Sequence, residues 1–314
     1  MEKTYFLGID GGGSKCKARL EDADGNFLGE YVSGPANPMR DYELAMTSLK
    51  DVIAGVFATA NLNIDNAANT HAVMGLAGLN IPCCLTKMSQ WQHPFATLQL
   101  TTDLHIACVG AHERTSGAIV IIGTGSSGLV CEEGRQLEYG GHGFSLGDKG
   151  SGAWFGAESI RYALETIDKL QPSSRFTVKL IESLDCQSAQ NIVEVFAQAS
   201  PAQFAQYAPL LFDYADLKDP VAVKIVKEGS LYINQLCQQL LQKKPQGLSL
   251  IGGLSDKVAP WLTPEIQAQI TPALNSPEVG AVLIARQQQA LEKNNQHSHL
   301  NSQQKTGTPI PDNK

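Results

Sequence analysis

Long apolar segments are missing from this chain of 314 residues. No apolar run approaches the roughly 18 residues that a membrane-spanning helix requires. The first residues lead directly into a strand-like pattern, without the basic and apolar blocks of a secretory signal. The sequence therefore predicts a cytoplasmic protein without a membrane partner.

Positive charge is also scarce. The chain has 24 lysines and arginines against 31 aspartates and glutamates, which gives a formal net charge of −7. An acidic surface repels polyanions, so nucleic acid is not an expected partner. An anionic ligand would depend on local features instead, such as backbone dipoles, a metal ion or a few lysines.

The chain also lacks a regular pattern of paired cysteines. The seven cysteines are odd in number, scattered along the chain, and without the spacing of metal ligands. This pattern predicts free thiols in a reducing compartment, most of them small buried side chains. The adjacent Cys83 and Cys84 leave a metal or redox pair open as an alternative, although neighbouring cysteines rarely chelate one ion.

What the chain does contain is a recurring glycine-rich turn. One apolar segment leads into 11–14 (GGGS), a second leads into 124–127 (TGSS), and a third precedes the glycine pair 252–253. Glycine lets a backbone approach a phosphate closely and direct N–H groups at it. The repetition predicts two related half-domains that bind a polyphosphate.

Two better-known phosphate motifs do not fit these turns. The segment 8–15 (GIDGGGSK) resembles a P-loop, but its serine precedes its lysine and a strand follows where that motif needs a helix. The segment 123–128 (GTGSSG) matches the dinucleotide fingerprint by letter, but strand and turn residues follow it instead of a helix. The turns therefore indicate a phosphate site that is built from hairpins.

Hydrophobic periodicity predicts an α/β fold in two halves and a polar tail. The expected strands are 4–10, 15–21, 27–33, 72–76, 98–101, 118–123, 127–132, 136–139 and 247–251. The expected helices are 41–60, 82–91, one starting at 104, a mostly helical region 150–244, and a last helix 279–291. The polar segment 293–314 lacks the apolar residues that would offset the entropy of ordering, so we expect a disordered tail.

Six segments carry a resemblance to a known family. The segments GIDGGGSK, IIGTGSSG and LIGGLSD resemble the two phosphate loops and the adenosine segment of sugar kinases, actin and heat-shock ATPases. The segments GPANP, TTD and GGHGFSLGDKGSG are similar to the N-acetylglucosamine kinase branch, which is related to the BadF/BadG/BcrA/BcrD ATPases. The resemblance implies a two-lobed actin-like fold of duplicated ribonuclease-H-like domains with a cleft between lobes, here 1–112 and 113–292.

The resemblance also implies an ATP site with Mg²⁺. Asp10 ends the first strand and is the expected Mg²⁺ ligand, since this ion takes few carboxylates and keeps several waters. The alternative for Asp10 is a hairpin aspartate whose carboxylate accepts hydrogen bonds from the N–H groups of the turn. The alternative for the glycine pair 252–253 is a turn at the start of a helix. The expected phosphate and adenosine contacts are Gly11, Gly12, Gly13, Ser14, Thr124, Gly125, Ser126, Gly252 and Gly253.

Asp103 is the expected catalytic base. It follows an apolar strand at the edge where α/β folds place their ligands, and the sugar kinases that it resembles use a carboxylate there to accept the proton of the sugar 6-hydroxyl. The alternative is an N-cap of the helix that begins at Leu104.

The sugar contacts are expected from both halves. The resemblance implies a set consisting of Asn37, Asp103, Thr124, Gly125, His142 and Asp148. Asn37 could instead be a turn residue before proline, and Asp148 a helix cap. His142 replaces the tryptophan of the animal enzymes at this position, which leaves unacetylated glucosamine open as a substrate.

The predicted function is ATP-dependent phosphorylation of N-acetylglucosamine at its 6-hydroxyl, with glucosamine kinase as the alternative. A BadF-type activator of a dehydratase is a second class, but it needs a cysteine pair that holds an iron–sulfur cluster between subunits. A sugar-sensing regulator is a third, and no helix-turn-helix is predicted ahead of Thr4. A homodimer is left open.

Overall fold

The computed structural model describes residues 3–305 except 115, 133, 134 and 187. The chain divides into two compact units. The first consists of Met1–Glu113 together with Asn275–Lys314, and the second of Arg114–Leu274. The chain leaves the first unit at Glu113 and returns at Asn275, and the side chains of these two residues are joined by a hydrogen bond of 2.8 Å. The second unit is therefore an insertion in the first.

The first unit contains a five-stranded sheet in the order β3-β2-β1-β4-β5. Strands β1, β2 and β3 pair antiparallel, whereas β1, β4 and β5 run parallel. The carboxyl ends of the three parallel strands therefore meet at one edge. The strands are β1 (Tyr5–Gly11), β2 (Cys16–Asp22), β3 (Phe27–Ser33), β4 (Thr70–Leu76) and β5 (Thr97–Thr101).

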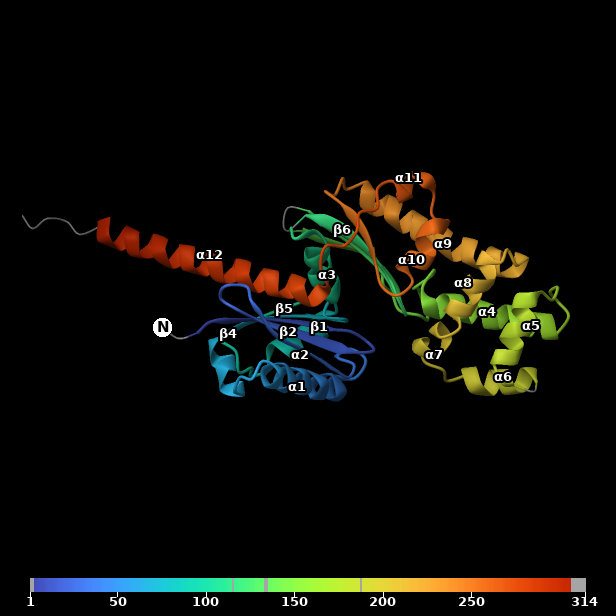
Figure 1. Cartoon of the computed structure of the whole chain (residues 1–314), viewed down its shortest axis with the longest axis horizontal. Coiled ribbons are helices and arrows are strands. Elements are labelled where there is room, and N and C mark those ends of the chain that lie inside the picture. Colours follow the sequence, from blue (N-terminus) through green and yellow to red (C-terminus); the bar gives the residue numbers. More distant parts are fainter. Residues whose placement is uncertain (1–2, 115, 133–134, 187, 306–314) are drawn as a thin grey trace, which may run out of the picture. The chain divides into compact units, whose positions relative to one another are not determined.

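Helices cover both faces of this sheet, with α1 on one side and α12 on the other (Figure 1). The alternation of β1 explains this: Leu7 and Ile9 join the core beneath α1, whereas Phe6 packs with residues of α3 and α12. Gly8 permits the close approach of α12, because a Cβ there would collide with the Glu278 carbonyl. The helical elements are α1 (Tyr42–Thr59), η1 (Ile64–Asn69), α2 (Pro82–Ser89), α3 (Asp103–His112) and α12 (Pro277–Lys305).

The second unit repeats the core of this topology in a four-stranded sheet, β8-β7-β6-β9. β6 pairs antiparallel with β7 and parallel with β9, as β1 does with β2 and β4. The sequence predicted two related half-domains, and the matching strand order confirms the repeat. The strands are β6 (Gly117–Ile122), β7 (Ser126–Glu132), β8 (Arg135–Gly140) and β9 (Leu248–Ile251).

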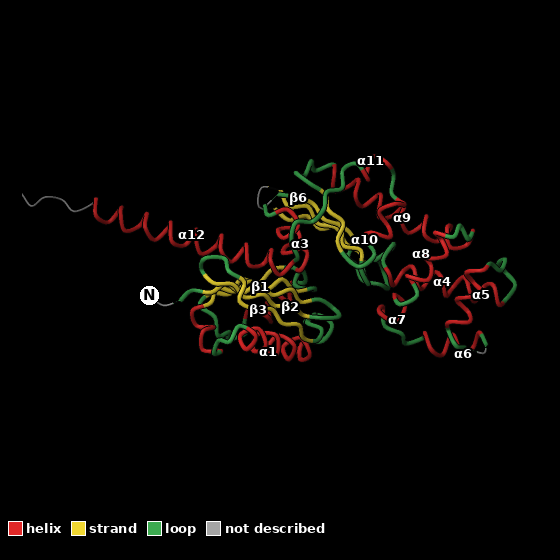
Figure 2. Tube along the Cα trace, viewed as in Figure 1, coloured by secondary structure: helices red, strands yellow, loops and turns green. Residues whose placement is uncertain are grey.

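The rest of the second unit is mostly helical, as the red segments labelled α4 to α11 in Figure 2 show. Its core joins residues of β6 with those of α4 and α9, including Val120, Phe155 and Ile233. The helical elements are α4 (Gly152–Ile167), α5 (Arg175–Ser183), α6 (Ala189–Phe196), α7 (Pro201–Ala205), α8 (Ala208–Asp216), α9 (Pro220–Leu241), α10 (Ser255–Val258), η2 (Ala259–Trp261) and α11 (Pro264–Gln267).

The C-terminal helix differs from the prediction in two respects. The sequence assigned 113–292 to the second lobe, but α12 packs on the first sheet and belongs to the first unit. The helix also continues past 291 to Lys305, so the predicted tail 293–314 is helical over its described part. Residues 292–305 contain neither glycine nor proline, and nothing in them ends a helix. Residues 306–314 lie outside the described residues.

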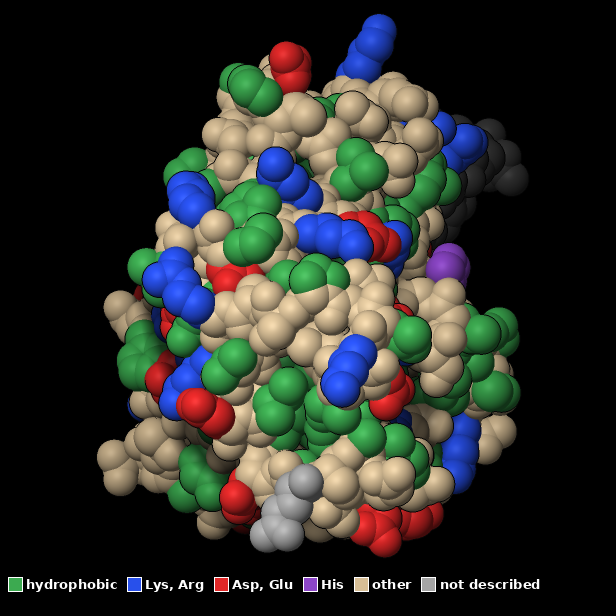
Figure 3. Space-filling model, turned by 90° about the vertical axis from the view of Figure 1, so that its right-hand side faces the viewer, with side chains coloured by type: hydrophobic (Ala, Val, Ile, Leu, Met, Phe, Trp, Pro, Cys, Tyr) green, Lys and Arg blue, Asp and Glu red, His purple; other side chains and the backbone are tan. Residues whose placement is uncertain are grey.

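The described residues carry surface charges of both signs and cysteines without disulfides. On the face drawn in Figure 3, lysine and arginine side chains lie scattered among acidic and apolar ones. None of the seven cysteines, all of which the structure describes, forms a disulfide, and Cys16, Cys108, Cys131 and Cys237 are buried. Within the described residues, no helix has the length and apolar character needed to cross a membrane.

Candidate active site

The first unit gathers its predicted residues at the edge where its parallel strands end. Asp10 lies beside Gly75 in the parallel pair of β1 and β4, and β5 ends at Thr101, two residues before Asp103. The Asp10 and Asp103 carboxylates are close enough to repel each other. The topology thus brings together two carboxylates that are far apart in the sequence.

The first glycine loop is a tight turn at this edge. The Gly12 N–H donates to the Lys15 carbonyl at 2.9 Å, which closes the turn. Gly11 is packed, since a Cβ there would lie 3.1 Å from the Ala36 Cβ and would also collide with Leu76. A Cβ on Gly13, in contrast, would meet no protein atom within 4 Å, and Ser14 is exposed beside it. Packing thus explains Gly11 but leaves Gly13 open to a ligand.

Asp10 has an unusual ionisation. Burial, then the carboxylates of Asp103 and Glu278, raise its pKa from 3.8 to about 7, although Lys15 and Lys17 oppose the shift. A buried carboxyl among other carboxylates gains free energy from a nearby cation. Asp10 therefore has the electrostatic environment of a metal ligand.

Asp103 is not the N-cap that the alternative interpretation expected. The cap of α3 is Thr102, whose hydroxyl accepts from the His105 N–H at 3.2 Å. Asp103 is the first residue of the helix, and its Oδ1 accepts from the Leu104 N–H at 3.0 Å. With the capping role taken by Thr102, Asp103 is half-buried beside Asp10.

Asn37 lies on a neighbouring loop that is joined to the first glycine turn. The Ala36 N–H donates to the Gly12 carbonyl at 2.9 Å. The Asn37 Oδ1 accepts from the N–H groups of Met39 and Arg40 at 3.0 and 3.2 Å, so this oxygen makes the turn that the alternative described. A contact with a ligand would therefore use its Nδ2 group.

The second unit gathers another set at the carboxyl ends of β6 and β9. A Cβ on Gly125 would lie 2.9 Å from the Asp148 Oδ2, so the second glycine loop and the Asp148 side chain are in close contact. Burial raises the pKa of Asp148, while N–H donors of Ser126 and Gly143 and the nearby His142 oppose the shift. Asp148 adopts a left-handed φ of 56°, and the cap of α4 is Ser151. Asp148 is thus not that cap.

Ser126 and Thr124 differ in their availability to a ligand. Ser126 is buried, and its hydroxyl donates to the Lys149 carbonyl at 2.9 Å. Since its N–H serves Asp148, Ser126 supports the loop. Thr124 is half-buried, and His142 is exposed on the Asp148 loop.

The third glycine segment combines a structural and an open position. Gly252 has a φ of +110°, and a Cβ there would lie 2.5 Å from the Ile122 carbonyl oxygen. Its carbonyl accepts from Ser255 Oγ at 2.8 Å at the start of α10, as the helix-start alternative expected. Gly253 is exposed, and a Cβ there would meet nothing within 4 Å. Gly123 is open in the same way.

Few groups at these edges could hold a metal. Among the described residues, no cluster of three or more histidine, cysteine, aspartate or glutamate side chains has the geometry of a metal site. The carboxylates at the edge of the first sheet fit Mg²⁺, which is commonly bound by one or two carboxylates, water and substrate phosphates. Asp10 is the residue whose surroundings favour such an ion.

Two residues beside Asp10 were not predicted. Lys17 is its direct partner in the antiparallel pair of β1 and β2, and Glu278 from α12 contacts the Lys17 Nζ at 2.9 Å. Strand alternation from Asp10 could have indicated Lys17. Nothing in the sequence pointed to Glu278, because α12 was assigned to the other lobe.

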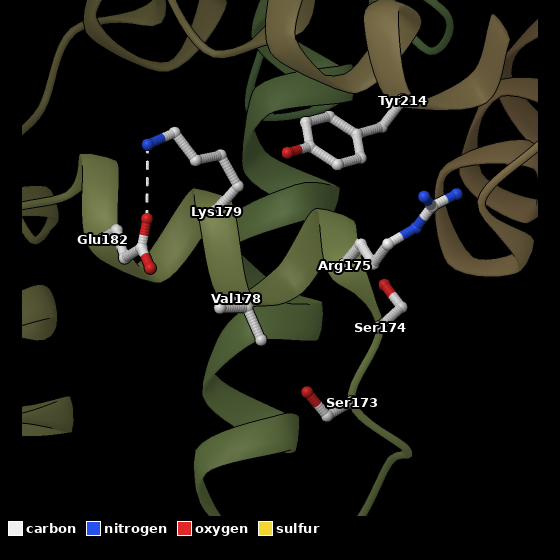
Figure 4. A pocket seen from close by; sticks show the side chains of 7 residues that line it. All are labelled: Ser173, Ser174, Arg175, Val178, Lys179, Glu182 and Tyr214. Atoms are coloured by element: carbon white, nitrogen blue, oxygen red, sulfur yellow. Dashed lines mark hydrogen bonds and ion pairs between the residues drawn. The ribbon is translucent and has the colours of Figure 1, made fainter. Parts of the chain in front are cut away.

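A cavity in the second unit lies away from these residues. It has a volume of about 650 Å³, and its seven lining residues come from the two residues before α5, from α5 itself and from Tyr214 of α8 (Figure 4). Its Lys179 pairs with Glu182 at 3.2 Å, and the Ser174 hydroxyl caps α5. None of the predicted residues lines this cavity, so its size does not mark the chemistry.

The sequence matches a known family over most of its length. A model of the BadF/BadG/BcrA/BcrD ATPase family matches residues 7–285. The glucosamine kinase GspK of Vibrio cholerae is 32% identical over 282 residues, which cover 90% of this chain and 96% of that protein. The N-acetyl-D-glucosamine kinase of Dictyostelium discoideum is 26% identical over 319 residues, 91% of this chain and 98% of that one.

A solved structure shares the fold. A protein of Chromobacterium violaceum, described as an N-acetylglucosamine kinase, superimposes with a TM-score of 0.85 at 26% sequence identity. The match covers 91% of this chain and 100% of that one. The architecture is therefore that of the two-lobed actin-like sugar kinases.

Proposed function

Because the chain belongs to the BadF/BadG/BcrA/BcrD ATPase family, we propose that it is an ATP-dependent kinase of an amino sugar. The reaction transfers the γ-phosphoryl group of ATP to the sugar 6-hydroxyl, and N-acetylglucosamine is the proposed acceptor. The observation that carries this proposal is the pair of Asp10 and Asp103 at the carboxyl ends of β1 and β5.

The two carboxylates have different proposed roles. Asp103 accepts the proton of the attacking hydroxyl, and Thr102 rather than Asp103 caps α3. Asp10 would hold Mg²⁺, which when bound neutralises charge on the phosphate oxygens. Phosphoryl transfer requires little more of a protein than this base, the metal site and accurate positioning of the substrates.

The open glycines support nucleotide binding. Gly13, Gly123 and Gly253 each occur in a segment that resembles a phosphate or adenosine loop, and at none of them does a protein atom or a left-handed φ require glycine. A ligand that approaches the backbone closely would require it. We propose contacts of ATP with these segments, with Ser126 supporting the second loop from within.

Glucosamine is the second candidate acceptor. His142 is exposed beside Asp148 and gives less apolar surface for an acetyl group than the tryptophan of the animal enzymes. The relative with 32% identity is a glucosamine kinase, whereas that of Dictyostelium discoideum acts on the acetylated sugar by name. Proposed contacts to either sugar are Asn37, Asp103, Thr124, Gly125, His142 and Asp148.

An ADP-release assay with a panel of sugars tests the proposal. N-acetylglucosamine, glucosamine, N-acetylmannosamine and glucose are compared at equal concentration, and mass spectrometry and NMR locate the phosphate in the product. We expect kcat/KM for one glucosamine derivative to exceed that for glucose by at least tenfold. Sugar-independent ATP hydrolysis, or phosphorylation of glucose alone, would contradict the amino-sugar assignment.

A further inference from the structure

A row of charged side chains crosses three strands of the first sheet next to Asp10. Asp10 and Lys17 are directly opposite in the antiparallel pair, so both side chains lie on the same face. Glu30 of β3 contacts the Lys17 Nζ at 3.1 Å, and Glu278 of α12 contacts it at 2.9 Å. One ammonium group is thus paired with two carboxylates, and a third, that of Asp10, belongs to its cross-strand neighbour on the same face.

The two partners of Lys17 differ strongly in burial. The Glu278 side chain is 5% exposed, whereas that of Glu30 is 50% exposed. The Ser276 hydroxyl also donates to the Glu278 Oε1 at 2.7 Å and fixes the carboxylate in place. Since exposed ion pairs contribute little and buried ones are costly to break, Glu278 is the partner that determines the position of Lys17.

We propose that Glu278 is a positioning residue, which pairs with Lys17 so that the Asp10 carboxylate remains available to a divalent cation. Without the Glu278 carboxylate in reach, the Lys17 ammonium would pair with its cross-strand neighbour Asp10. Lysine and metal would then compete for one carboxylate. The inference rests on the proposed role of Asp10 in the kinase.

The charge-retaining variant Glu278→Asp tests this directly. Its side chain is one methylene shorter, so it keeps the negative charge near Asp10 but loses the 2.9 Å contact with Lys17. We expect the dissociation constant of Mg²⁺ in the presence of saturating ADP, measured by calorimetry, to rise about tenfold. The KM for Mg²⁺ should rise equally, and kcat at saturating Mg²⁺ should stay within about twofold.

Two companion variants separate positioning from folding. Lys17→Met in the Glu278→Asp background removes the competing ammonium and should restore the Mg²⁺ affinity of the wild type. Glu30→Gln is the matched control, since it removes the exposed partner of the same lysine and should leave Mg²⁺ affinity unchanged. Glu278→Gln, if it folds, should resemble Glu278→Asp.

The outcomes distinguish this inference from the proposed function. Unaltered Mg²⁺ affinity in Glu278→Asp, or failure of the double variant to recover it, would overturn the positioning role while leaving the kinase intact. If the wild-type protein bound ADP equally well with and without Mg²⁺, both the positioning role of Glu278 and the proposed metal role of Asp10 would be overturned, because Asp10 would then not serve a metal.

Discussion

At the residue scale, hydrogen bonds and packing distinguish structural residues from those with a proposed catalytic or binding role. Thr102 caps α3 and Asp103, the proposed base, follows it, so the helix cap and the proposed base are two neighbouring residues. Gly252 and Gly253 also differ in role, since backbone geometry requires glycine at 252 but not at 253. Adjacent substitutions therefore test each role against its own control.

Asp103→Asn should lower kcat by about two to four decades, because it removes the proposed general base. The affinity for sugar and the melting temperature should change little. Thr102→Ala is the control: it removes the true cap and should cost about 1 kcal/mol of stability. Steady-state kinetics and thermal unfolding measure both. A kcat for Asp103→Asn within a few-fold of the wild type would refute the role as base.

Gly253→Ala should weaken ATP binding about tenfold, which corresponds to about 1.4 kcal/mol, while stability stays within about 0.5 kcal/mol. The added methyl group would approach the proposed nucleotide, and no protein atom lies within 4 Å of it. Gly252→Ala should instead destabilise the fold, because alanine would need a φ of +110° against the Ile122 carbonyl. Nucleotide titrations and chemical denaturation compare the two, and equal effects of both variants on stability would contradict the distinction.

At the scale of elements, α12 is the helix that covers one face of the first sheet. Arg286 joins it to the hairpin of β2 and β3, with 3.0 Å to the Glu21 Oε2 and 2.6 Å to the Asp22 carbonyl oxygen. The same guanidinium lies 4.3 Å from the centre of the Phe6 ring. The packing contacts that are described for α12 thus come from the first half of the helix.

Deletion of 296–314 should leave activity and melting temperature nearly unchanged, since the packing residues that are described for α12 precede this segment. Arg286→Ala is the contrasting change and should cost about 1–3 kcal/mol, because charged hydrogen bonds are lost. Thermal unfolding measures both variants. A large loss on truncation would mean that the final turns of α12 contribute to the fold.

The contact between α12 and β2 should depend on pH. Burial acts to raise the pKa of Glu278, but hydrogen bonds from Lys17 and Ser276 outweigh it and lower the pKa below 4.5. Glu278 chiefly raises the pKa of Lys17 above 10.5. A carboxyl whose pKa is lowered on folding stabilises the fold at pH values above its pKa in the unfolded chain. An amine whose pKa is raised on folding stabilises the fold at pH values below its pKa in the unfolded chain. The pair therefore contributes from about pH 4.5 to 10.5.

The stability difference between wild type and Glu278→Gln tests this window. We expect about 1.5–3 kcal/mol at pH 7. The difference should shrink as the pH falls below 4.5, where Glu278 becomes protonated. Urea unfolding at several pH values measures it, and a difference that is constant with pH would contradict an ionic contribution.

At the scale of the whole molecule, the chain is a duplicated domain in which one copy is inserted in the other. The second unit is a continuous segment, Arg114–Leu274, with its own sheet and core. The residues that flank it, Glu113 and Asn275, are hydrogen-bonded to each other. Inserted domains whose ends lie close together are often independent folding units.

The fragment Arg114–Leu274 should therefore fold alone, with helical circular dichroism and one cooperative thermal transition. It should not phosphorylate sugar, because it lacks Asp10 and Asp103. A fragment that stops before Leu248 omits β9 and should lose the transition. Absence of cooperative unfolding in the longer fragment would show that the second unit depends on the first for its stability.

The sequence by itself determined the elements and the repeat. Periodicity placed most strand and helix boundaries within two residues, since alternating and helical patterns reflect local burial. The glycine-rich turns at 11–14 and 124–127 marked the loops, because glycine lets a backbone approach a phosphate closely. The motifs also predicted the family that the comparisons found.

Only the tertiary structure decided which residues share an environment. The pairing of Asp10 with Asp103, the packing of α12 on the first sheet and the role of Glu278 depend on contacts between segments far apart in the chain. Local sequence patterns carry no information about such partners. For the same reason, hydrogen bonds rather than spacing assigned the cap of α3 to Thr102 and turned Ser126 inward to support its loop.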